Sequence, residues 1–76
     1  MVSAGKTYVV RSVEAGDRPD EVTYVYAYTL HGLLTALEDA RFRSDGGTPQ
    51  ELVLLTDGES KVLRRFESGH EVPPTP

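Results

Sequence analysis

The chain has 76 residues, a formal net charge of −4 at pH 7 and no cysteine. This length predicts a single domain, near the lower size limit for a chain that folds without a disulfide or a metal. The missing cysteines exclude disulfides, thiolate metal sites and thiol nucleophiles, and the acidic balance gives no overall attraction to nucleic acid, anionic membranes or acidic partners.

The first third of the chain predicts two strands. Residues 1–5 have small side chains for the most part, and we expect a flexible amino terminus there. Residues 6–13 are rich in β-branched and aromatic side chains, which favour a strand. Residues 14–20 combine Gly, Pro and Asp, which favour turns, and lead into a second strand over 22–28. The two strands therefore predict a hairpin with a long tip.

Tyrosines alternate along the second predicted strand. Tyr24, Tyr26 and Tyr28 are two residues apart, so a pleated backbone would place their rings on the same face. Val25 and Ala27 lie on the other face. Rings with hydroxyl tips suit a surface that meets water, a partner or a ligand. In the alternative arrangement, the tyrosines pack beneath a helix with their hydroxyls at its rim.

An amphipathic helix is predicted next. Thr29 suits the N-cap. The apolar residues that follow recur at helical spacing and predict the face that packs on the sheet: Leu30, Leu33, Leu34, Leu37 and Ala40. The helix should end at residues 44–47, where glycine can adopt the left-handed conformation that closes a helix.

Two further strands are predicted after Pro49. Residues 52–55 are continuously apolar, Asp57 and Gly58 suit a tight hairpin turn, and residues 61–67 form the fourth strand. Residues 69–76 are rich in proline, and we expect a flexible tail that joins no sheet.

The predicted order is ββαββ, which indicates an α+β domain over residues 6–68 with one helix packed on one face of an antiparallel sheet. One helix covers one face only, whereas the strand over 52–55 is apolar on both sides. Two copies could cover the second face by pairing sheet to sheet or edge to edge, because two-fold dimers are the commonest oligomers.

Membrane association and export find no support in the sequence. The longest apolar run, residues 52–55, is far too short to span a bilayer, and the amino terminus lacks a basic segment followed by an apolar one. We expect a soluble, cytoplasmic protein.

Catalysis is also not indicated. His31, Thr35, Glu38 and Phe42 share one flank of the predicted helix and could form a small polar site, but acid and base catalysis would also need a substrate pocket. The alternative is a solvated flank, with Phe42 packed against a loop. The chain has no nucleophile in a glycine elbow and no cluster of metal-binding carboxylates, so we expect no enzyme activity, metal or cofactor.

The sequence therefore predicts a non-catalytic protein-interaction module that forms a homodimer through its tyrosine-rich strand. The candidate interaction surface consists of Tyr24, Tyr26, Tyr28, Arg64 and Arg65. The alternative is a protein that binds single-stranded nucleic acid, with bases stacked on the rings and phosphates held by the arginines. Arg64 lies between two apolar residues of the fourth strand, so we expect it to be buried against a tyrosine ring or a carboxylate such as Glu51.

Overall fold

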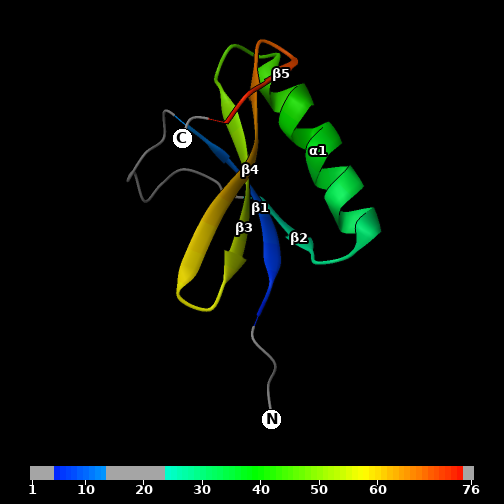
Figure 1. Ribbon diagram of the computed structural model, residues 1–76. Helices are drawn as coiled ribbons and strands as arrows, with labels where there is room; N and C mark the ends of the chain where they lie inside the picture. The colour runs from blue at the N-terminus through cyan, green and yellow to red at the C-terminus, as the bar shows by residue number, and fades with distance from the viewer. Residues whose placement is uncertain (1–4, 14–23, 75–76) are drawn as a thin grey trace.

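A five-stranded antiparallel sheet and one helix make up residues 5–13 and 24–74, the part of the chain that the computed structural model describes (Figure 1). The elements in chain order are β1 (Thr7–Ser12), β2 (Tyr24–Ala27), α1 (Leu30–Ser44), β3 (Gln50–Thr56), β4 (Glu59–Glu67) and β5 (His70–Val72). The strand order in the sheet is β2-β1-β3-β4-β5. The predicted α+β class, with one helix on an antiparallel sheet, is confirmed.

Three of the predicted segments lie outside the described residues. They are most of the amino-terminal segment (1–4), the tip of the first hairpin with the start of its second strand (14–23), and the last two residues of the tail (75–76).

The strand β5 corrects the prediction that the carboxyl end joins no sheet. His70–Val72 pair with the end of β4, after a two-residue turn in which Ser68 and Gly69 have φ values of 53° and 80°. Two positive φ values are typical of the type I′ turn that matches the twist of paired strands. Pro73 and Pro74 come only after the strand has ended, so their missing N–H groups disturb no ladder hydrogen bond.

Both ends of α1 lie where the sequence predicts them. The Thr29 side chain accepts a hydrogen bond from the Gly32 N–H at 2.9 Å, which satisfies one of the free donors of the first turn. After the last helical residue, Gly47 has a φ of 105°, a left-handed conformation that glycine adopts at little cost. The turn at Asp57 and Gly58 between β3 and β4 is confirmed as well.

The face that α1 turns toward the sheet is not the predicted leucine stripe. The helix residues that are buried are small: Gly32, Ala36, Ala40 and Ser44. Leu30 and Leu34 are instead 72% and 56% exposed, and Leu33 and Leu37 are half-buried.

The short connection between β2 and α1 explains why small residues, and not the leucines, face the sheet. Only Tyr28 and Thr29 separate β2 from α1, which holds the first turn of the helix against the strand. A Cβ atom on Gly32 would lie 2.0 Å from the carbonyl oxygen of Ala27. Large side chains cannot occupy the line of closest approach, so the leucines are rotated onto a flank of the helix.

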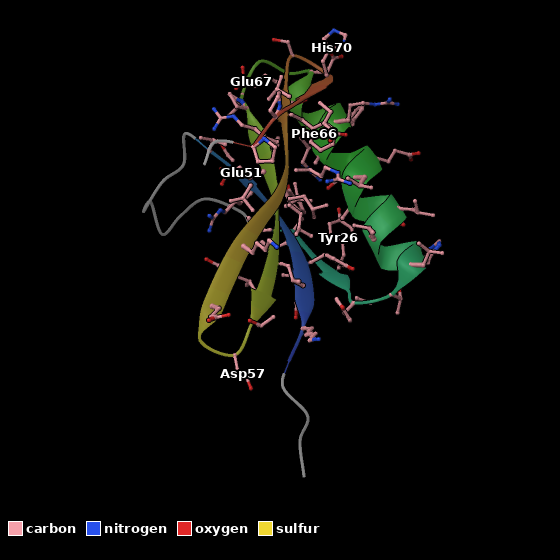
Figure 2. The ribbon with its side chains drawn as sticks, in the orientation of Figure 1. Tyr26, Glu51, Asp57, Phe66, Glu67 and His70 are labelled. Atoms are coloured by element: carbon pink, nitrogen blue, oxygen red, sulfur yellow. The ribbon has the colours of Figure 1, made fainter. Side chains whose placement is uncertain are left out.

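The core lies between α1 and the sheet. Val10, Leu52 and Phe66 are buried there with Ala36 and Ala40, and Figure 2 shows Phe66 at the helix side of β4. Each large apolar side chain contributes about 1.5 to 3 kcal/mol when fully buried, so these few residues account for much of the stability of the domain.

The opposite face of the sheet is also apolar at its centre. Val9 and Val53 are buried there, and the strand register sets them in one row with Val25 on β2 and Val62 on β4. This agrees with the prediction that both faces of the sheet carry apolar side chains.

The helix crosses the sheet diagonally (Figure 1). It begins beside Ala27 of β2 and ends beside Gly69, whose N–H donates to the buried Ser44 Oγ at 3.0 Å. The ends of β1 and of the β3–β4 hairpin project beyond the helix. On the helix side of that hairpin lies a hollow of about 480 Å³. No helix among the described residues is long and apolar enough to cross a membrane.

Candidate functional site

Two of the three tyrosines of the predicted interaction surface pack inside the domain. Tyr24 and Tyr26 are half-buried against the core on the helix side of the sheet, and Val25 points to the other face with 65% exposure. This is the alternative arrangement, with the rings beneath the helix. Tyr28 follows the end of β2, is 47% exposed, and stacks on Tyr8 with 5.2 Å between ring centroids.

Side chains of α1 hold the two half-buried tyrosines. The Tyr26 hydroxyl donates a hydrogen bond to Asp39 Oδ2, and Arg43 Nε donates to the same oxygen at 2.8 Å. The Arg43 guanidinium also lies over the Tyr24 ring, 3.4 Å from its centroid. Figure 2 shows the Tyr26 side chain between β2 and α1. The cluster therefore fastens the edge strand to the helix through a charge-assisted network.

The protonation states in this cluster suit a structural role. Burial raises the pKa of Tyr26 to about 12, and its hydrogen bond to the Asp39 carboxylate acts in the same direction. The hydrogen bond to Asp39 also raises the pKa of Arg43. At neutral pH Tyr26 is a phenol that donates and Arg43 is a cation, so neither acts as a base or nucleophile.

The two arginines of the predicted surface lie on opposite faces of β4. Arg64 pairs with Glu71 across to β5, with 3.3 Å between Nε and Oε2, and Arg65 pairs with Glu67 at 2.8 Å. The structure therefore brings neither arginine onto a tyrosine ring, and each has a carboxylate partner already.

The expectation that Arg64 is buried beside Glu51 is wrong, because Arg64 lies opposite Leu52 on the helix side of the sheet and Glu51 lies on the other face. The strand β4 also contains a β-bulge. One extra residue in β4 shifts the register, so Val62 lies on the face opposite the helix while Phe66 lies in the core. A regular strand would place Val62 and Phe66 on the same face, and the bulge places them on opposite faces. The Arg64 side chain is 51% exposed, and Glu51 pairs with Arg11 instead, at 3.3 Å.

The flank of α1 that carries His31 and Glu38 is exposed, which agrees with the alternative of a solvated flank. The Thr35 hydroxyl donates to the His31 carbonyl at 2.9 Å, a bond within the helix itself. Phe42 is 77% exposed and is not packed against a loop.

An open groove of about 730 Å³ runs over the second half of the helix. Its lining includes Glu38, Asp39 and His70, which come from α1 and from β5. Within residues 5–13 and 24–74, no group of three or more His, Asp or Glu side chains is placed to hold a metal ion.

A surface that the sequence analysis missed lies where α1 meets the uncovered part of the sheet; we call it the apolar corner. Its wall is the leucine flank of α1, and its floor is the helix-side face of β1 and β3 together with Tyr28. The corner comprises Leu30, Leu33, Leu34, Leu37, Tyr8, Tyr28 and Leu54.

Contacts and register link five of the seven residues of the apolar corner. Leu33, Leu37 and Tyr8 all pack against the edge of the same core cluster. Tyr28 stacks on Tyr8, and Tyr8 is the register partner of Leu54. A signal for this surface was present in the sequence, because small residues four apart on a helix indicate a close approach that excludes the neighbouring leucines.

The rim of the apolar corner carries both signs of charge. The Lys6 ammonium lies 5.3 Å from the centroid of the Tyr28 ring. On the other side, Glu59 and Lys61 line the hollow of the β3–β4 hairpin next to Leu54. An apolar centre with a polar, charged rim is typical of surfaces that bind other proteins.

Comparisons with known proteins found no family model, no curated protein and no solved structure that matches this chain.

Proposed function

We propose that this protein is a small, non-catalytic protein-interaction module and that its contact surface is the apolar corner. The observation that carries the proposal is the exposure of Leu30 and Leu34, at 72% and 56%, on a helix whose sheet-facing line holds only small residues. Each large apolar side chain left in water forgoes about 1.5 to 3 kcal/mol of burial. A partner that covers the corner would bury these side chains and recover this free energy.

The tyrosine-rich strand contributes to this surface through Tyr28. Tyr24 and Tyr26 do not belong to the corner, but their contacts with Asp39 and Arg43 hold β2 to the second half of α1. The helix wall and the sheet floor of the corner are therefore held in place before a partner binds, which lowers the conformational entropy lost on binding.

Binding of single-stranded nucleic acid has no observation in its favour. It requires open rings beside free cations. Tyr24 and Tyr26 are half-buried under α1, and Arg64 and Arg65 are each paired with a glutamate.

The test is a Leu34→Ser substitution with Phe42→Ser as the matched control. Both side chains are more than half exposed on α1, but only Leu34 belongs to the apolar corner. We expect Leu34→Ser to change the free energy of unfolding of dilute protein by no more than about 0.5 kcal/mol, as surface substitutions do. It should also lower the fluorescence of a dye that binds exposed apolar surface, whereas Phe42→Ser should lower it far less.

Two results would contradict the proposal. If Leu34→Ser destabilises the dilute protein by several kcal/mol, the leucine serves the fold of its own domain. If dye fluorescence is the same in Leu34→Ser and the native chain, the corner is not an accessible apolar surface.

A further inference from the structure

We infer that the occupant of the apolar corner is a second copy of this chain, bound about a two-fold axis. The inference rests on the proposed function, because it names the partner of that same surface. In such a pair, the leucine flank of each helix would lie on the uncovered sheet floor of the other copy.

The shape of the corner supports a second copy. The surface has two unlike parts: a helix flank on which Leu30 and Leu34 are exposed, and a hollow in the β3–β4 hairpin that lies next to Leu54 at the end of the floor. A two-fold contact requires that one surface carry both a feature and its complement. The diagonal path of α1 leaves this combination on each copy.

The charges at the rim support it as well. Glu59 and Lys61 are both exposed and both lie on the helix side of β4, since their register partners are Thr56 and Leu54. Neither takes part in an ion pair between described residues. Across a two-fold axis, Lys61 could face Glu59 of the partner subunit, and the same contact would form a second time.

The mixed rim also argues against a strongly charged partner. The chain as a whole is acidic, with a formal net charge of −4, so two copies repel each other over most of their surfaces. A rim that carries Lys6 and Lys61 as well as Glu59 avoids that repulsion. Like charges set against each other cost several kcal/mol, whereas complementary ones orient the contact.

The available area predicts a dimer of modest affinity. A standard interface buries about 800 Å² on each partner, which is roughly one seventh of the 5310 Å² of accessible surface of this chain. The apolar corner and its rim comprise about ten residues, fewer than the 20 to 30 per side of a standard interface. We therefore expect a dimer that dissociates on dilution.

The experiment is a charge exchange between two variants. A Glu59→Lys chain carries two cations at this part of the rim, and a Lys61→Glu chain carries two carboxylates. Each variant alone should dimerise at least about 10-fold more weakly than the native chain, because both two-fold contacts become repulsive. A 1:1 mixture should form heterodimers with an affinity near that of the native homodimer.

The readout is the mass in solution over a concentration range, by light scattering, with native mass spectrometry of a mixture in which one variant carries an isotope label. Glu67→Lys and Arg11→Glu are the controls, because they change the net charge by the same amounts on the opposite face of the sheet. Melting curves of all four variants confirm that each is folded.

The inference is overturned if the native chain is monomeric at every concentration, if the two rim variants dimerise as the native chain does, or if their mixture stays monomeric. These outcomes are separable from failure of the proposed function. Loss of dye binding in Leu34→Ser together with a monomeric native chain would keep the corner as a contact surface and assign it to a different partner.

Discussion

Replacing Gly32 by alanine should destabilise this protein, although alanine is the better helix former. Gly32 lies in the first turn of α1, at the point where the helix comes closest to β2. An added Cβ atom would lie 2.0 Å from the carbonyl oxygen of Ala27 and 3.2 Å from Thr29 Oγ1. The first contact involves backbone, which cannot rotate away, so the helix start must move.

The expected loss follows from three contributions. Overpacking of a tight site costs about 1 to 3 kcal/mol, and here the upper part of that range applies because a backbone atom is met. The displaced turn also weakens the hydrogen bond from the Gly32 N–H to the N-cap Thr29, worth about 1 kcal/mol. Alanine regains about 1 kcal/mol of helix propensity. The net prediction is a loss of about 2 to 3 kcal/mol.

Urea denaturation followed by circular dichroism measures this loss. Gly46→Ala is the matched control, because its Cβ would meet only the Arg43 carbonyl oxygen at 3.4 Å, an ordinary contact, and its φ is not positive. That variant should be within about 0.5 kcal/mol of the native chain. A Gly32→Ala protein as stable as the native one would show that the close approach of α1 to β2 is not the constraint that sets the orientation of the helix.

Two further predictions concern the contacts that hold α1 in place. Ser44→Ala should lower the free energy of unfolding, measured by urea denaturation, by about 1 to 3 kcal/mol, because the Gly69 N–H loses the buried hydroxyl that accepts its hydrogen bond. The control is Ser60→Ala, at an exposed position, which should change the free energy of unfolding little. Tyr26 ionises near pH 10 in the unfolded chain and at about 12 in the folded one, so its stabilising effect is complete below pH 10 and is lost as the pH rises toward 12. Tyr26→Phe should therefore flatten the fall in stability over this interval, and equal slopes for the two proteins would show that burial and the hydrogen bond to Asp39 do not raise the pKa of Tyr26.

Much of the fold could be predicted because its signals are local. The N-cap at Thr29, the helix end before Gly47 and the turn at Asp57 and Gly58 each depend on atoms a few residues apart. The same kind of signal was available for β5, since Ser68 and Gly69 form a turn of their own, but the prolines that follow outweighed it in the prediction.

The candidate site could be predicted only in part. The alternation of Tyr24 and Tyr26 correctly placed both rings on one face, but it could not decide whether that face meets the helix or the solvent. Arg64 and Arg65 were adjacent in sequence, and the strand separated them onto two faces with different glutamate partners. The apolar corner was absent from the prediction because the leucines were assigned to the core.

The sequence by itself determined which segments are helix and which are strand, because periodicity, capping and turn chemistry act within a few residues along the chain. The tertiary structure decided which faces are buried, because that depends on how closely separate elements approach. The bulge in β4 places Val62 on the face opposite the helix. The short connection that brings Gly32 against Ala27 and the diagonal path of α1 set the distances between the helix and the sheet. Together they bury a line of small residues and leave Leu30 and Leu34 at the surface, where we propose that a second copy binds.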